Sequence, residues 1–388
     1  MTFFLITSAI KVFAVLNLIL VGVALLTLLE RRVCAWMQDR LGPNRVGPQG
    51  LFQPAADGLK NILKEETSPA MADKALFTLA PMVSFVPALL TFGVIPFASP
   101  LPTKWGVVPM VVADLPVGFL YILAISSLGV YGIVLAGWAS NNKYALLGGL
   151  RASAQMISYE IALGMSTVAV ILLAGNVTLS QVIAQQQLAH AWFIIPLTVA
   201  FVIFFISALA ETNRLPFDLP EAEGELIAGY HTEYSAMKFS MFYIAEYSNM
   251  VTASALMATL FFGGWDIPFT TWDSTGDPSV LKTLLTLATF GAKTFAFLFT
   301  YIWVRWTLPR FRYDQLMALG WKVLLPLSLI YITLVAVAIW FVRIRLGWEY
   351  GAGMAWVLGG LNFVLLIALV YWLDRGRIVS VSVQEEAA

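Results

Sequence analysis

Three glutamates lie in stretches of the sequence that are otherwise apolar. Glu160 and Glu246 each stand within such a stretch, and Glu211 ends a third. A charged side chain is costly inside a membrane, so each one indicates a functional site. A buried carboxylate without a partner can accept or pass a proton, which makes the three a predicted charge relay. The alternative is a structural pair of a glutamate with Lys293 that holds two helices in register, and for Lys293 the structural interpretation is favoured.

Carboxylates also crowd together between Glu211 and Glu233, with Arg214 the only Arg or Lys among them. Crowded acids raise each other's pKa values, because ionising one disfavours ionising the next. A solvated acidic loop is the ordinary interpretation of such a run. Against it, Pro216 and Pro220 restrict the backbone, and Phe217 and two tyrosines stand among the charges. The segment could therefore receive a ligand with a polar head group and an apolar tail.

The earlier segment from Glu30 to Lys74 is the other long charged stretch. Residues 42–50 contain two prolines and three glycines, which exclude a helix and favour a fixed turn. Residues 51–64 then place apolar side chains on one helical face and Gln53, Asp57 and Lys60 on the other, which predicts an amphipathic helix at the membrane interface. It is either a surface anchor or, given the rigid turn before it, the wall of a site.

The elements that position these groups are membrane spans. The chain is 59% hydrophobic and 12% charged, whereas soluble domains carry about 25% charged residues. A span needs about 20 mainly apolar residues. We expect an all-α polytopic membrane protein with a single membrane domain over 1–388. It should contain an acidic loop at 211–238 and a mobile tail at 378–388. The sequence predicts about nine transmembrane helices, at 3–29, 75–98, 107–138, 154–174, 191–210, 239–263, 283–304, 323–342 and 352–373.

The basic residues predict the orientation. With the N-terminus outside and the C-terminus inside, all but six of the 23 Lys and Arg residues fall on the inner side, as the positive-inside rule requires. The exceptions are Lys11, Lys104, Lys282, Lys293, Arg343 and Arg345. Both long charged loops are then inside. Asp114, before Pro116 at the outer end of the third span, is expected to cap that helix.

Several functions are excluded by composition. A net charge of zero implies no nucleic-acid partner. Cys34, His190 and His231 are the only Cys and His residues, too few for an iron–sulfur centre, and no glycine-rich dinucleotide fingerprint opens a helix. We therefore expect no redox cofactor and no metal on this chain. Any redox chemistry would use cofactors of partner chains.

Six runs of residues carry a resemblance to a known family. They are ERR from Glu30, GPNRVGP from Gly42, GWASNNKYALLG from Gly137, RASAQMISYE from Arg151, ETNRLPFDLPEAE from Glu211 and EYSAMKF from Glu233. In order and spacing they resemble the H-type membrane subunit of the proton-pumping NADH:quinone oxidoreductase, respiratory complex I, over nearly the whole chain. The resemblance implies a membrane subunit beneath a peripheral arm that carries flavin and iron–sulfur clusters, in a bacterial inner membrane or an equivalent energy-transducing membrane.

The resemblance also implies roles for particular residues, with quinone as the substrate. The quinone-binding positions are Glu30, Arg31, Gln53, Asp57, Lys60, Arg214, Phe217, Asp218, Glu221, Glu223 and Glu225. Glu211, Glu160 and Glu246 match carboxylates that lead toward antiporter-like partner subunits. Quinone reduction would thereby be coupled to proton translocation. No residue is assigned to covalent catalysis.

The chain departs from the family pattern in two places, and two other functions compete. Ser126 and Ser127 stand where some relatives carry an acid, and the ninth span, present in only part of the family, is expected to be a packing helix. A free-standing proton-coupled transporter is one rival, but the inverted repeats typical of transporters are not evident. The other is the related subunit of a membrane-bound hydrogenase, which uses no quinone. The two long charged loops favour the quinone enzyme.

Overall fold

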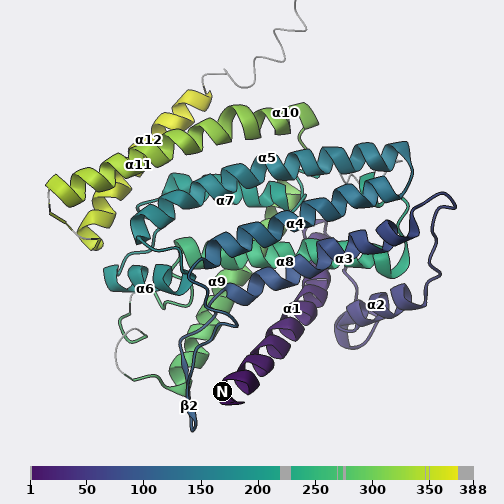
Figure 1. Cartoon of the computed structure of the whole chain (residues 1–388), viewed down its shortest axis with the longest axis horizontal. Coiled ribbons are helices and arrows are strands. Elements are labelled where there is room, and N and C mark those ends of the chain that lie inside the picture. Colours follow the sequence, from purple (N-terminus) through teal and green to yellow (C-terminus); the bar gives the residue numbers. More distant parts are fainter. Residues whose placement is uncertain are drawn as a thin grey trace, which may run out of the picture.

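The computed structural model describes residues 2–218, 229–268, 270–273, 277–345, 347–348 and 350–374. Long helices dominate it, and most of them run side by side across the molecule (Figure 1). The helices are α1 Thr2–Met37, α2 Gln53–Leu63, α3 Lys74–Leu90, α4 Gly118–Ala139, α5 Lys143–Ala174, α6 Leu179–Ala189, α7 Thr198–Glu211, α8 Ala236–Phe261, α9 Val280–Thr307, α10 Tyr313–Ala318, α11 Leu325–Arg345 and α12 Ala352–Asp374. A short antiparallel hairpin joins β1 Leu101–Thr103 to β2 Gly106–Val108.

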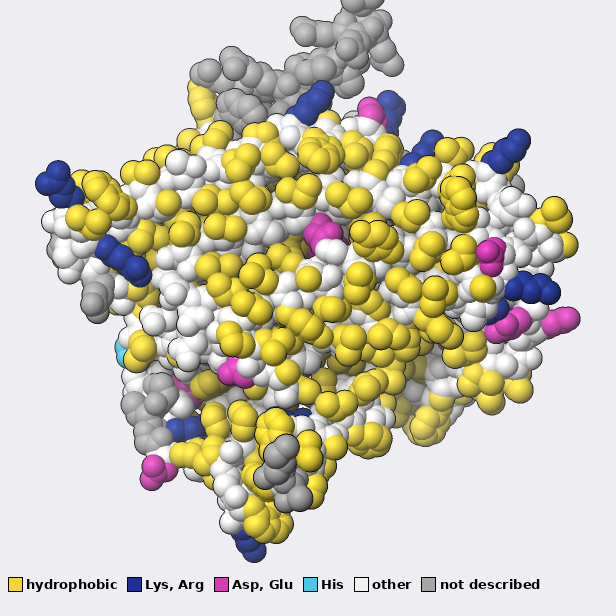
Figure 2. All heavy atoms as spheres, viewed as in Figure 1, with side chains coloured by type: hydrophobic (Ala, Val, Ile, Leu, Met, Phe, Trp, Pro, Cys, Tyr) yellow, Lys and Arg dark blue, Asp and Glu magenta, His cyan; other side chains and the backbone are white. Residues whose placement is uncertain are grey.

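Seven of the described helices are long and apolar enough to cross a membrane. They match seven of the nine expected spans, and the all-α membrane fold is confirmed. The other two expected spans correspond to α7, which has only 14 residues, and to α8, which includes Lys238 and Glu246. Figure 2 shows a mainly hydrophobic face on which most of the Lys and Arg side chains lie near the margins.

The third span begins later than expected. Residues 107–117 were predicted as part of its helix, but α4 starts only at Gly118, after the hairpin and a run of turns. Pro109 and Pro116 explain the difference, because proline lacks the N–H that a helix interior uses. Asp114 does not cap α4: its carboxylate accepts hydrogen bonds of 2.9 Å from the Ser180 hydroxyl, which ties this segment to α6.

Small residues allow the central helices to pack closely. A Cβ added to Gly132 of α4 would lie 2.8 Å from the backbone nitrogen of Ser84 in α3, so these two helices touch through their backbones. A Cβ at Gly137 would lie 2.7 Å from the carbonyl oxygen of Ala145 in α5. The interior formed by α3, α4, α5, α7 and α8 is therefore a dense scaffold, and polar groups held within it have little freedom to move.

Candidate functional site

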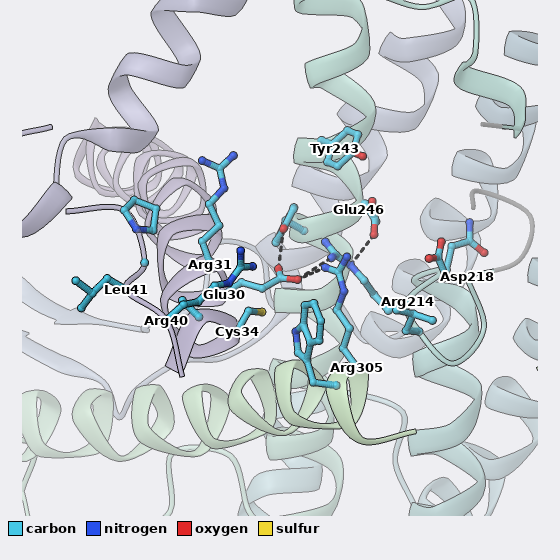
Figure 3. A pocket seen from close by; sticks show the side chains of 17 residues that line it. Glu30, Arg31, Cys34, Arg40, Leu41, Arg214, Asp218, Tyr243, Glu246 and Arg305 are labelled. Atoms are coloured by element: carbon cyan, nitrogen blue, oxygen red, sulfur yellow. Dashed lines mark hydrogen bonds and ion pairs between the residues drawn. The ribbon is translucent and has the colours of Figure 1, made fainter. Parts of the chain in front are cut away.

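Four charged side chains from distant parts of the sequence meet in one buried ion network: Glu30, Arg214, Glu246 and Arg305 (Figure 3). Arg214 lies between the two acids, with Nη1 3.3 Å from Glu30 Oε1 and Nε 2.6 Å from Glu246 Oε1. Arg305 pairs with the same oxygen of Glu30. The Tyr247 hydroxyl donates to the other oxygen of Glu30 at 2.7 Å. Two acids and two guanidiniums give the network a net charge of zero.

Each member of the buried ion network is positioned by a different element. Glu30 lies in the last part of α1, Arg214 follows the end of α7, Glu246 is in α8, and Arg305 is in the last turn of α9. The Arg214 guanidinium also lies over the Tyr247 ring, 4.2 Å from its centroid. Burial disfavours the charged form of Arg214, but the nearby Glu246 carboxylate and the other negative groups more than offset this and raise its pKa. Arg214 is therefore a fixed positive centre.

The buried ion network forms one wall of a cavity of about 440 Å³. The other lining residues come from the end of α1, the turn at 40–43, the segment after α7, and helices α8 and α9. They are Arg31, Cys34, Ala35, Arg40, Leu41, Gly42, Pro43, Asn213, Leu215, Asp218, Tyr243, Tyr247 and Trp306. The cavity combines charged groups with aromatic and aliphatic surface, an arrangement that suits a small ligand with a polar and an apolar part.

The predicted residues of the first loop lie beside this cavity. Arg31, which lines it, pairs with Asp57 of α2 at 2.6 Å, and Gln53 donates to the same carboxylate at 3.1 Å. Lys60 is exposed and does not line the cavity. The outer face of α2 exposes Leu59, Ile62 and Leu63. The helix is therefore joined to the cavity through one ion pair while its apolar side chains face outward.

The predicted residues of the acidic loop divide into three groups. Phe217 is buried, and its ring packs against Tyr159 and Phe311. Asp218 lines the cavity and pairs with Arg310 at 3.1 Å. Glu221, Glu223 and Glu225 lie outside the described residues, as does the predicted tail at 378–388.

The remaining two glutamates of the predicted relay, Glu160 in α5 and Glu211 at the end of α7, do not line the cavity of the buried ion network. Glu160 accepts a hydrogen bond from Ser127, one of the two serines expected from the resemblance to depart from the family pattern. Glu211 lines a small cavity of about 30 Å³ together with Ser126, Asn249 and Thr252. A cavity of this size holds about one water molecule. Both serines therefore stand next to carboxylates of the predicted relay.

The proposed pairing of a glutamate with Lys293 is wrong for the described residues. The Lys293 ammonium donates to the carbonyl oxygens of Phe262, Gly264 and Asp266 at 2.6 to 3.0 Å. Glu246 pairs with Arg214 instead. Lys293 is therefore held by main-chain carbonyls and not by a glutamate.

Two important members of the site were missed from the sequence. Arg305 was counted only as a loop charge for orientation, and Tyr247 was not considered. Arg305 ends an apolar stretch, just as Glu211 does, and that position was the available signal. Nothing in the sequence around Tyr247 distinguishes it from other tyrosines. Among the described residues no group of three or more His, Cys, Asp and Glu side chains could hold a metal ion.

The fold and the site together define a class: an integral membrane protein of α-helices whose charged side chains meet in a polar cavity at one end of the helix bundle. A family model described as NADH dehydrogenase matches residues 10–336.

Curated relatives give the particular family. The first H-type subunit of NADH-quinone oxidoreductase from Geobacter metallireducens is 51% identical over 86% of this chain and 96% of its own length. The second H-type subunit from Geobacter sulfurreducens is 51% identical with the same coverage. The first H-type subunit from Cytophaga hutchinsonii is 48% identical over 87% of this chain and 97% of its own. The chain belongs to the family of H-type subunits of NADH-quinone oxidoreductases.

Proposed function

We propose that the cavity beside the buried ion network binds the quinone head group, and that the charge of the network responds to quinone reduction. The observation that carries the proposal is the meeting of Glu30, Arg214, Glu246 and Arg305 at a cavity of about 440 Å³. The relatives are named as subunits of NADH-quinone oxidoreductases, which supplies the substrate class. The flavin and iron–sulfur clusters of such an enzyme would belong to partner subunits of a peripheral arm.

The lining of the cavity supports a quinone with an apolar tail. Tyr243, Tyr247 and Trp306 offer aromatic surface, and the guanidiniums offer hydrogen-bond donors to carbonyl oxygens. Outside the cavity, α2 and the outer part of α1 expose apolar side chains that could contact the tail or lipid. The proposed contribution of this chain is positioning and electrostatics, with the electrons supplied by cofactors elsewhere.

The experiment on binding compares two electron acceptors. Arg31→Ala in the assembled complex should slow NADH:quinone reduction while electron transfer to an artificial acceptor stays at the wild-type rate. The reason is that Arg31 lines the cavity, whereas the artificial acceptor takes electrons before they reach it. Lys64→Ala is the matched control, because Lys64 is an exposed cation that follows α2 and does not line the cavity. Equal loss of both activities in assembled Arg31→Ala complex would contradict a local role.

Charge movement is the second half of the proposal. A quinone that gains two electrons carries negative charge until it takes up two protons and becomes the neutral quinol, so negative charge develops transiently beside the buried ion network. Two unit charges 4 Å apart interact by about 4 kcal/mol at an effective dielectric constant of 20. That energy is enough to change the protonation of a nearby carboxylate. We propose that the change passes from the network through Glu211 and Glu160 toward antiporter-like partner subunits.

Glu246→Gln tests this coupling because it keeps the shape and removes the ionisation. Quinone-coupled turnover and proton pumping should fall together, while the complex still assembles. A complex with this substitution that pumps at the wild-type ratio of protons to electrons would remove Glu246 from the relay.

The proposed setting is a bacterial cell membrane with the N-terminus outside, so that the cavity faces the cytoplasmic side.

A further inference from the structure

A second polar cluster lies where the segment after α8 meets α6 and α9, on the opposite side of the molecule from α2 (Figure 1). Its central cation is Lys293. The ammonium has three donors, and three main-chain carbonyls accept them, those of Phe262, Gly264 and Asp266. It also lies 4.4 Å from the centroid of the Trp192 ring. Lys293 therefore supplies positive charge to the cluster but has no donor left for a carboxylate.

Two buried aspartates, Asp266 and Asp273, lie next to this cation, and each is close enough to the other to influence its ionisation. They are 8% and 4% exposed. The Trp192 indole donates to Asp266 Oδ2 at 2.8 Å. Gln187 and the main-chain N–H of Ile267 donate to Asp273 Oδ2 at 2.9 and 3.2 Å. No donor of the described residues reaches the buried Asp273 Oδ1.

Two ionised carboxylates in contact repel each other, and an unsatisfied buried oxygen adds a further cost. One proton shared by the two acids removes the repulsion, and the unsatisfied Asp273 Oδ1 is an oxygen available to bind it. Burial, with the neighbouring Asp273 as a further cause, raises the pKa of Asp266 to about 6. The charged groups that face the pair are Lys293 and, across the adjoining cavity, Lys282, both from α9.

One member of the pair, Asp273, lines a second cavity. A cavity of about 420 Å³ is lined by Asp273, Gln187, Lys282, Ser99 and Trp265, and it shares no lining residue with the cavity of the buried ion network. A proton could thus reach Asp273 without passing Glu30 or Glu246.

We propose that Asp266 and Asp273 share a single exchangeable proton and form a proton-binding site at the end of the molecule opposite the buried ion network. The proton is taken from the cavity lined by Asp273 and lies between the two carboxyl groups, with no bond to Lys293. The site gains one positive charge when it is loaded. Lys293 and Arg305 are twelve residues apart in α9, about 18 Å at 1.5 Å per residue, so this site and the buried ion network are separate.

The test follows the protonated carboxyl group by infrared spectroscopy in the purified, intact complex. On lowering the pH from about 8 to about 5, wild-type complex should gain a carboxylic C=O absorption that shifts in D₂O, with a midpoint within about one unit of pH 6. Asp273→Asn should remove this component. Its amide oxygen can still accept from Gln187 and Ile267, and its NH₂ can donate to Asp266, so the substituted loop should fold.

Two further variants make the result specific. Asp266→Asn removes the other member of the pair and should abolish the same absorption. Asp277→Asn changes an exposed aspartate of the same segment and should leave it unchanged. If Asp273→Asn and Asp266→Asn complexes keep the wild-type titration, or if no carboxyl group that titrates between pH 5 and 8 differs between them and the wild type, the pair is a fixed structural contact and the proposal is overturned.

Discussion

Replacing Arg214 by Met should expose the electrostatic balance of the site most directly. In the wild type Glu30 and Glu246 are matched by Arg214 and Arg305. Arg214→Met leaves a net charge of −1, and Glu246 loses the cation that lies 2.6 Å from one of its oxygens. Glu30 keeps Arg305 and Tyr247 as partners. The loss of electrostatic stabilisation should therefore affect mainly Glu246.

The expected cost can be worked from that distance. At 2.6 Å and an effective dielectric constant of 20, the attraction between Arg214 and Glu246 is about 6 kcal/mol. Part of it offsets the desolvation of the two ions. Removing one partner of a buried pair costs about 3–5 kcal/mol in measured cases. If the whole cost appeared in the rate of unfolding, thermal inactivation would accelerate by about two to four orders of magnitude, which is an upper limit.

The matched comparison is the double variant Arg214→Met/Glu246→Gln, in which the site is again neutral. It should recover much of the lost stability, because replacing both partners of a buried pair is far less costly than removing one. The assay is the half-life of the purified complex at a fixed elevated temperature, followed by NADH oxidation with an artificial acceptor and by the amount of intact complex. If the double variant is no more stable than Arg214→Met alone, the two residues do not form a coupled pair and the reasoning is wrong.

Three further predictions concern packing, pH and topology. Gly132→Ala should lower the half-life of the heated complex by an amount equivalent to about 1–3 kcal/mol, because its Cβ would meet the backbone of α3. Gly129→Ala on the same helix has open space around its Cβ and should have no effect. Burial lowers the pKa of His231 to about 4, below its unfolded value of about 6.5. The free energy of unfolding should therefore fall by about 2 kcal/mol from about pH 7.5 to pH 5. His231→Gln should make the half-life of the heated complex less sensitive to acid. In a background without its one native cysteine, a membrane-impermeant thiol reagent added outside should label Leu188→Cys but not Arg45→Cys, and the reverse pattern would overturn the proposed orientation.

The sequence could predict the spans because an apolar run of about 20 residues has few alternatives to a transmembrane helix. It could also single out Glu246 as a charge within an apolar stretch and Arg214 as the lone cation of the acidic loop, whereas Glu30 was assigned through the resemblance alone. It could not predict that they pair, since Arg214 and Glu30 are 184 residues apart and the contact depends on how α1, α7 and α8 pack. Lys293 shows the same limit. Its partners are main-chain carbonyls, which every residue possesses and no sequence motif marks.

The predicted start of α4 was wrong for a different reason. Hydropathy alone extended the third span back to residue 107, but the local chemistry of Pro109 and Pro116 decides where the helix can begin. Asp114 is likewise a plausible cap by residue type, yet its actual partner, Ser180, belongs to another helix. Average polarity predicts that a span exists. Its first residue depends on single hydrogen bonds that only the fold reveals.

The neutrality of the buried ion network determines how far its influence extends. A balanced set of charges has no monopole, so its potential declines with distance more steeply than that of a lone ion. Adding or removing one proton at Glu246 or Glu30 creates a monopole, whose potential declines only as the inverse of distance. Within the apolar interior, counter-ions from solution screen that potential weakly. Remote groups therefore sense little of the resting network and respond chiefly to a change in its protonation.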